Sequence, residues 1–171
     1  MATAYIVDAV RTAGGRRGGK LAGVHPVDLG AAVFDAIADS NQFDTKAIDD
    51  VITGCVSQGG QQTMDLGRNA VLASKLPDSI PAVTIDRQCG SSQQATNLAS
   101  SLVGSGVVDI AVACGVEVMS RIPIGSNGSK KLGLGVPIPK SYFARYEMTS
   151  QFEGAERIAE KWGISREDTD R

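Results

Sequence analysis

Short apolar runs alternate with amphipathic stretches along the first two thirds of the chain. Runs of β-branched or small apolar residues that are bounded by Gly, Pro or Asp are typical of buried strands. The sequence therefore predicts strands at four places: Ala4–Val10, Val51–Val56, Ala82–Ile85 and Ile110–Cys114.

Between these runs, apolar residues recur at every third or fourth position, which predicts helices. The predicted helices are Pro26–Ser40, Leu66–Leu76 and 91–103. Pro26 suits a first helical position, and Pro77 prevents the second helix from continuing. Strands that alternate with helices imply βαβ units, so the predicted fold class is α/β with a parallel sheet.

The pattern changes in the last third of the chain. Gly, Pro, Ser and Lys dominate Ile122–Lys140 without a sustained period, which indicates a long excursion loop. Helical spacing returns over Ala155–Trp162, and Ser165 with Asp168 forms a capping-box pattern that opens another helix. The chain stops within the first turn of that helix, so we interpret its end as that of a fragment or a split chain.

Composition and charge exclude several classes of protein. The 171 residues are 42% hydrophobic and 21% charged, which is the balance of a globular domain or of part of one. The net charge of −2 provides no excess of positive charge to attract the phosphates of nucleic acid. The longest apolar stretch, Val107–Met119, contains two acidic residues and is shorter than a membrane span, and no basic leader is present. We therefore expect a cytoplasmic protein that binds neither nucleic acid nor membranes.

One of the three cysteines is the candidate nucleophile. Cys55, Cys89 and Cys114 have no Cys-x-x-Cys spacing, which argues against a disulfide framework and a metal site. Cys89 lies between the strand Ala82–Ile85 and the helix that begins near Ser91, where helix N–H groups favour a thiolate. The competing interpretation of Cys89 is that it is a small buried hydrophobic residue. Cys55 and Cys114 lie in apolar strands, where burial raises a thiol's pKa, so structural packing is the better interpretation for both.

Three ordered motifs give the sequence a family resemblance. They are Val7-Asp8-Ala9-Val10-Arg11-Thr12, Asp86-Arg87-Gln88-Cys89-Gly90-Ser91-Ser92 and Gly115-Val116-Glu117-Val118-Met119-Ser120. From near residue 4 to its end, the chain resembles the amino-terminal half of thiolases, the acetyl-CoA acyltransferases. The resemblance implies a thiolase-like fold, with residues 1–120 as a first βαβαβ-type half that has a mixed sheet and helices on both faces. Residues 121–171 would begin an inserted loop domain.

The resemblance also implies a function, which is acyl transfer through a cysteine thioester. The reaction is either thiolysis of a 3-ketoacyl-CoA or Claisen condensation of acyl-CoA, and Cys89 matches the acyl-accepting nucleophile. The family's histidine base and second cysteine come from the second half, which this chain lacks. We interpret His25, the only histidine here, as a cap or surface residue. Gly90 and Ser91 are expected to support Cys89 because glycine permits close backbone approach and serine supplies a cap group. The resemblance implies supporting roles for Glu117 and Met119.

Further expectations concern ligands and assembly. The family uses coenzyme A as substrate or product, holds no permanent cofactor, and forms homodimers or homotetramers. This chain alone is expected to be catalytically incomplete, with the second half supplied by a longer chain or by a partner. The acetoacetyl-specific branch carries a histidine shortly before the helix that matches Gly154–Trp162, but Met148–Phe152 contains none. A degradative 3-ketoacyl-CoA thiolase is therefore favoured.

Three alternatives stay open. A ketoacyl synthase-like condensing enzyme would have a related fold and a similar turn around its cysteine. A truncated, non-catalytic thiolase-like subunit or interaction module would keep the fold without the base. Gly14–Lys20 fits the letters of a phosphate-binding loop, but Leu21 replaces the Ser or Thr that would hold magnesium, so a solvated basic turn is favoured.

Overall fold

The computed structural model describes residues 3–40, 43–129, 131 and 133–171. The chain divides into two compact units, 1–127 and 128–171. The sequence motifs place the corresponding boundary after residue 120.

The described part of the first unit is built on three parallel strands. They are β1 (Asp50–Gly54), β2 (Ala82–Ile85) and β3 (Ala111–Gly115), and the strand order is β2-β1-β3. The central strand β1 is buried along most of its length, as expected for a parallel strand covered on both faces. The prediction of a mixed sheet is not met by these three strands, because every pairing among them is parallel.

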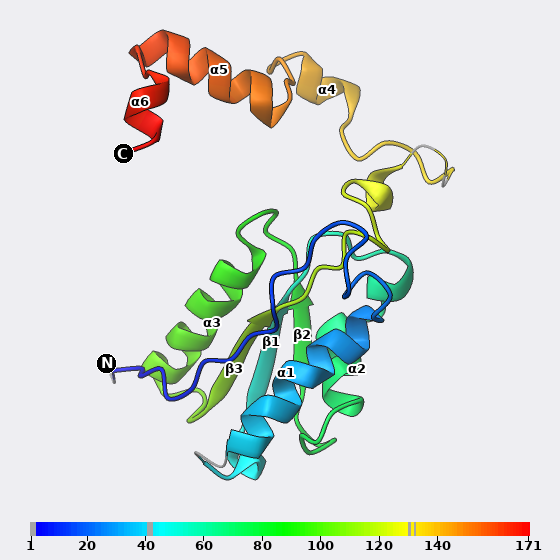
Figure 1. The fold of residues 1–171 in the computed structure, drawn as a ribbon, viewed down its shortest axis with the longest axis vertical. Helices are drawn as coiled ribbons and strands as arrows, with labels where there is room; N and C mark the ends of the chain where they lie inside the picture. Colours follow the sequence, from blue (N-terminus) through cyan, green and yellow to red (C-terminus); the bar gives the residue numbers. More distant parts are fainter. Residues whose placement is uncertain (1–2, 41–42, 130, 132) are drawn as a thin grey trace. The chain divides into compact units, whose positions relative to one another are not determined.

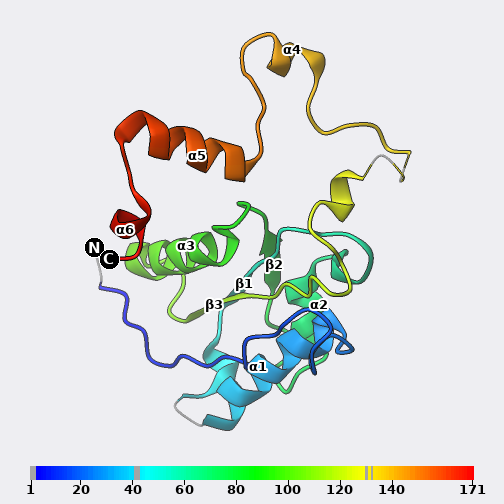
Figure 2. The same ribbon diagram turned by 45° about the horizontal axis from the view of Figure 1, so that its top comes forward.

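Helices cover both faces of this sheet, which confirms the α/β class. The helices α1 (Pro26–Ser40) and α2 (Leu66–Leu72) lie on one face, and α3 (Ser91–Ser105) lies on the other (Figures 1 and 2). The chain moves outward from β1 to β2 and then returns past β1 to β3. Because crossovers between parallel strands are right-handed, this reversal of direction puts α2 and α3 on opposite faces.

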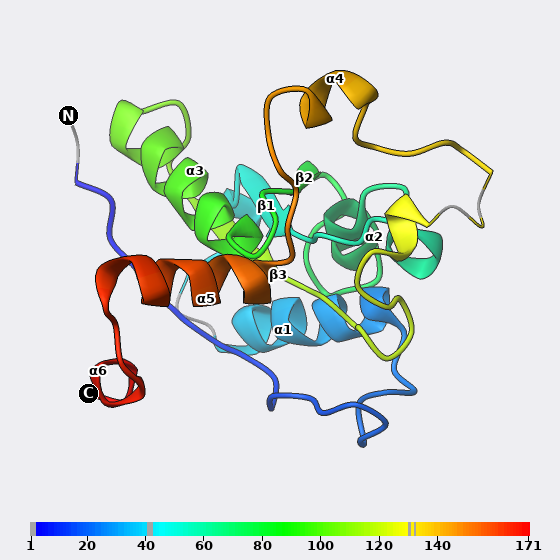
Figure 3. The same ribbon diagram turned by 90° about the horizontal axis from the view of Figure 1, so that it is seen from above.

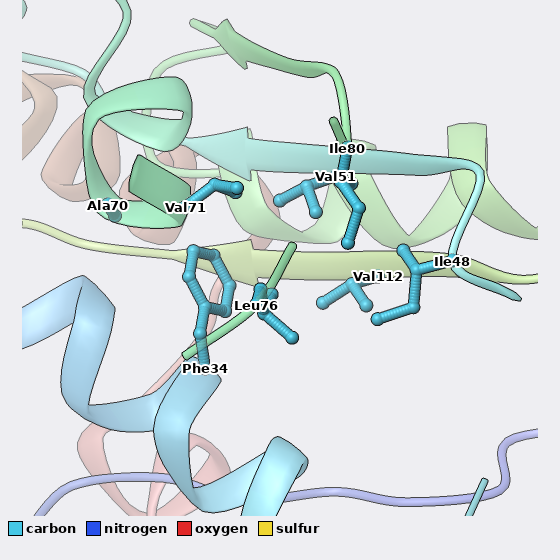
Figure 4. Packing of buried hydrophobic residues seen from close by; sticks show 8 residues of the cluster. All are labelled: Phe34, Ile48, Val51, Ala70, Val71, Leu76, Ile80 and Val112. Atoms are coloured by element: carbon cyan, nitrogen blue, oxygen red, sulfur yellow. The ribbon is translucent and has the colours of Figure 1, made fainter. Parts of the chain in front are cut away.

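Each face of the sheet has its own hydrophobic core. On the α3 face, Ile52 packs with Ala95 and Ala99, and these small side chains bring the helix close to the strands. On the opposite face, the aromatic ring of Phe34 in α1 packs in one cluster with side chains from α2 and from the sheet (Figure 4). That cluster consists of Phe34, Ile48, Val51, Ala70, Val71, Leu76, Ile80 and Val112.

In the first unit, one predicted helix is shorter in the structure and one predicted strand is absent, while the ends of the other predicted elements differ by at most two residues. The helix predicted to reach Leu76 ends at Leu72, because the Ser74 hydroxyl donates to the carbonyl of Val71 (2.8 Å) and competes with the next helical turn. The strand predicted at Ala4–Val10 is wrong. This segment has no regular structure, and Tyr5 and Ile6 are about four-fifths exposed, because strand propensity alone does not order a segment that has no paired neighbour.

The described residues of the second unit form three α-helices, none of which has a buried residue. These are α4 (Lys140–Phe143), α5 (Gln151–Trp162) and α6 (Arg166–Thr169). The capping box predicted at Ser165 is present, and α5 ends at Gly163 in the left-handed conformation. The assignment of this unit to a loop domain stays a prediction.

Candidate active site

Cys89 is exposed in the turn that connects the carboxyl end of β2 to α3. Gly90 is the N-cap residue of α3, so Cys89 immediately precedes the cap. The structure thus places Cys89 at a strand-to-helix junction, as the sequence indicates. An exposed thiol at this position is accessible to a reagent or substrate. Seen from above in Figure 3, α3 extends from this junction along the sheet.

The turn around Cys89 is fixed by hydrogen bonds on both sides. The buried Ser91 hydroxyl accepts from the backbone N–H of Arg87 (2.9 Å) and donates to the carbonyl of Gln88 (2.6 Å). The backbone N–H of Gln88 donates to the Asp86 carboxylate (2.7 Å). Gln88 has a φ of +49°, a conformation that non-glycine residues seldom adopt unless surrounding contacts hold it. Ser91 therefore contributes most to the shape of the turn, and Gly90 provides the helix cap.

A second polar cluster joins the loops that follow β1 and β3. The Glu117 carboxylate accepts from the backbone N–H groups of Val56 (2.7 Å) and Ser57 (3.2 Å) and from the Gln62 side-chain amide (3.1 Å). Gln62 is fully buried; it also donates to the Ser57 carbonyl (2.9 Å) and accepts from the Val118 N–H (2.8 Å). These bonds show that Glu117 supports the loop after β1. They go to that loop rather than to the turn that carries Cys89.

Met119 and Glu117 lie beyond the end of the last strand, because β3 ends at Gly115. The Met119 side chain is about half exposed. Both residues line a cavity of about 990 Å³ that lies between residues 10–18, residues 113–120 and α1. Cys89 is not among the lining residues of this cavity. The described residues thus bring Glu117 and Met119 together with each other but not with the cysteine.

The other two cysteines are less accessible than Cys89. Burial raises the pKa of Cys55 to about 12, with a further contribution from the negative charge of Glu117. Burial raises the pKa of Cys114 to about 11, against the opposing effect of a contact with the Thr53 hydroxyl (3.1 Å). Both thiols stay protonated at neutral pH, as predicted for cysteines in apolar surroundings.

Alkylation by iodoacetamide at pH 8 is expected to modify Cys89 first. A thiol with a pKa of about 11 is only about one-thousandth ionised at that pH, so Cys114 reacts slowly even when the reagent reaches it, and Cys55 reacts more slowly still. Labelling of Cys114 should rise about tenfold per pH unit toward pH 11. Peptide mapping by mass spectrometry measures the three rates. Equal labelling of all three cysteines in the folded chain would contradict this assignment, and the unfolded chain is the control.

The single histidine has a local structural contact. Its Nδ1 accepts from the backbone N–H of Val27 (3.2 Å) at the start of α1, as expected for a helix cap. Gly14–Lys20 forms exposed loop and turns rather than the entry to a helix, since α1 begins only at Pro26. The phosphate-binding alternative therefore lacks the helix start that it requires.

The described residues contain neither a cluster of metal ligands nor a membrane-spanning helix. Within the described ranges, no three His, Cys, Asp or Glu side chains gather in a way that would hold a metal ion. No helix in the same part of the chain has the length and apolar character needed to cross a membrane.

Sequence reasoning missed three residues that shape this region: Gln62, Gly54 and Gly115. A glutamine in a polar stretch gives no sign that it will be buried, and a glycine at a strand end gives no sign of what approaches it. Their importance depends on how β1, β3 and α3 meet in space.

Comparisons with known proteins agree with this fold. Residues 4–171 match the family described as "Thiolase, N-terminal domain". The chain is 48% identical to a steroid 3-ketoacyl-CoA thiolase of Mycobacterium tuberculosis and 38% identical to a beta-ketoadipyl-CoA thiolase of Acinetobacter baylyi. It aligns over 100% and 99% of its own length but over only 44% and 45% of theirs, so it spans less than half of these curated relatives.

A solved structure of a related enzyme also resembles this chain over part of its length. The crystal structure of the Bacillus anthracis acetyl-CoA acetyltransferase superposes with a TM-score of 0.70 at 30% sequence identity, over 88% of this chain and 39% of that one. The match to thiolases argues against the ketoacyl synthase alternative. The chain belongs to the thiolase family and corresponds to its amino-terminal domain.

Proposed function

We propose that this chain is the amino-terminal part of a thiolase that cleaves 3-ketoacyl-CoA, with Cys89 as the acyl-accepting nucleophile. The observation that carries the proposal is the exposed thiol of Cys89, held in a hydrogen-bonded turn directly before α3. Membership of the thiolase family supports the reaction class, which is acyl transfer between thioesters.

The proposed reaction has two balanced halves. The Cys89 thiolate attacks the 3-keto carbonyl, the bond between C2 and C3 breaks, and the electron pair and a proton go to C2, which leaves as acetyl-CoA. The shortened acyl group stays on the sulfur as a thioester. The thiolate of free CoA then attacks this thioester, releases the new acyl-CoA and regenerates the Cys89 thiolate. Coenzyme A is thus substrate and product, and the proposal requires no permanently bound cofactor.

The chain supplies the nucleophile for this reaction but not a base. Its only histidine interacts with the start of α1, and Cys55 and Cys114 keep their protons at neutral pH. We infer that the base comes from the part of the protein that the relatives have and this chain does not span. The 171 residues alone are therefore expected to show no turnover. The alternative is that the protein is a non-catalytic thiolase-like subunit, which would show no activity even as the complete protein.

The relatives suggest the acyl group. The 48% identical relative is named for steroid 3-ketoacyl-CoA, whereas the 38% identical relative is named for beta-ketoadipyl-CoA. The higher identity favours a bulky, ring-containing acyl group. The absence of histidine from Met148–Phe152 favours degradation over acetoacetyl-CoA chemistry.

We further infer that the protein acts in the cytoplasm as a homodimer or homotetramer. The strand β2 lies at an edge of the described sheet, where Val83 is 43% exposed. An edge strand of this kind offers backbone groups for pairing with a second chain.

The complete protein is expected to convert a steroid-derived 3-ketoacyl-CoA to acetyl-CoA and a shortened acyl-CoA when free CoA is present. Rates with a steroid-derived substrate and with beta-ketoadipyl-CoA, followed by mass spectrometry of the products, measure the preference. Absence of CoA-dependent cleavage of either substrate would count against the proposal. Turnover by the 171-residue chain alone would contradict the inference that this chain lacks a catalytic base.

A further inference from the structure

Two glycines lie under the start of α3, at the carboxyl ends of β1 and β3. Gly54 and Gly115 are direct partners in the β1–β3 register. A Cβ atom on Gly54 would lie 2.4 Å from the backbone nitrogen of Ser92 and 2.5 Å from the backbone carbon of Ser91. A Cβ atom on Gly115 would lie 2.7 Å from the Cβ of Ser92. We call Gly54 and Gly115 the glycine pair.

These distances show that only glycine permits the observed packing at either position. Ordinary contacts of a Cβ atom begin at 3.4 Å, so an alanine at position 54 would have to push the helix start away by about 1 Å. The overlap at position 54 is with backbone atoms, which cannot rotate aside. The overlap at position 115 is with the side chain of Ser92.

The helix start that contacts the glycine pair also fixes the turn around Cys89. Ser91, whose backbone touches Gly54, holds the backbone of Arg87 and Gln88 through its buried hydroxyl. A shift of the backbone at position 91 therefore moves or breaks both bonds. Cys89 lies between Gln88 and Ser91, so its sulfur moves with them.

We infer that the glycine pair positions the nucleophile: Gly54 and Gly115 let α3 begin directly on the sheet, and this contact fixes the Cys89 turn in its reactive geometry. The inference rests on the proposed role of Cys89. Gly54 and Gly115 act through the helix start and are positioning residues rather than catalytic ones.

The test begins with Gly54→Ala in the complete protein. A displacement of about 1 Å at a reacting group costs about 100-fold in rate, so the rate of Cys89 acylation, and kcat with it, should fall by about that factor while KM changes little. Gly67→Ala is the matched control, because its Cβ atom would lie 2.5 Å from the Thr53 hydroxyl on the opposite face of β1. This control should lower stability toward urea without slowing acylation at Cys89.

A rescue experiment separates positioning from general destabilisation. Gly115→Ala overlaps the Ser92 side chain, so adding Ser92→Gly should restore the acylation rate to that of Ser92→Gly alone. The same second substitution should not rescue Gly54→Ala, because the overlap there is with backbone atoms. If Gly54→Ala does not fold, the comparison of Gly115→Ala with the double variant Gly115→Ala/Ser92→Gly tests the inference instead.

Two results would overturn the inference. One is equal slowing of acylation by Gly54→Ala and Gly67→Ala, and the other is failure of Ser92→Gly to rescue Gly115→Ala. If the wild-type protein is not acylated at Cys89, the proposed function fails instead. The rate of Cys89 alkylation by iodoacetamide in the same variants of the 171-residue chain then tests the positioning role. Alkylation should be slower in Gly54→Ala and Gly115→Ala than in the wild type and Gly67→Ala.

Discussion

Replacing Cys89 with alanine in the complete protein is expected to lower the rate of acyl transfer by at least about 10⁴-fold, because loss of a catalytic nucleophile removes the covalent route altogether. The side chain is exposed, so the free energy of unfolding should change by less than about 0.5 kcal/mol. Steady-state thiolysis and urea unfolding measure the two quantities separately.

The matched control for this substitution is Cys114→Ala. Cys114 lies in β3 and contacts Thr53, so its replacement should lower stability and leave the thiolysis rate within a few-fold of the wild type. The assignment of the nucleophile would be wrong if Cys89→Ala retained activity, or if Cys114→Ala lost it while the protein remained folded.

Replacing Gln62 with leucine is expected to lower the free energy of unfolding by about 1–3 kcal/mol. The substitution leaves the Val118 N–H without its partner in a buried site, and an unsatisfied buried group costs about 1–3 kcal/mol, whereas the Ser57 carbonyl still accepts from the Gly59 N–H. It also removes the amide that donates to Glu117. Urea unfolding of the 171-residue chain, followed by circular dichroism, measures the effect.

The neighbouring glutamine provides the control for that measurement. Gln61 is exposed, and its side chain accepts from Arg121 at the surface (2.6 Å), so Gln61→Leu should change stability by less than about 0.5 kcal/mol. Equal effects of the two substitutions would show that the buried amide of Gln62 does not hold the loops after β1 and β3 together.

Elements that depend on local signals could be predicted from the sequence. Pro26 marks the start of α1, and β1, β2 and β3 are recognisable as short runs of β-branched or small apolar residues. The segment Ala4–Val10 has the same strand propensity, yet it is unpaired in this chain. Propensity identifies a segment that is able to form a strand, whereas pairing depends on a neighbour that the local sequence does not contain.

The same distinction applies to the site. The position of Cys89 could be predicted because a strand, a glycine-containing turn and a helix follow one another directly in the sequence. The burial of Gln62 and the crowding at Gly54 and Gly115 depend on segments that are far apart in the chain. The strand register and the distance between helix and sheet determine those contacts, and neither can be derived from periodicity.

A covalent acyl group on Cys89 is the central intermediate of the proposed reaction. The most direct measurement is the mass of the complete protein after brief incubation with a 3-ketoacyl-CoA in the absence of free CoA, followed by peptide mapping. We predict one added acyl group, located on the peptide that contains Cys89 and removed by free CoA. An acyl group on another residue, or an unmodified protein that still forms product, would contradict the account.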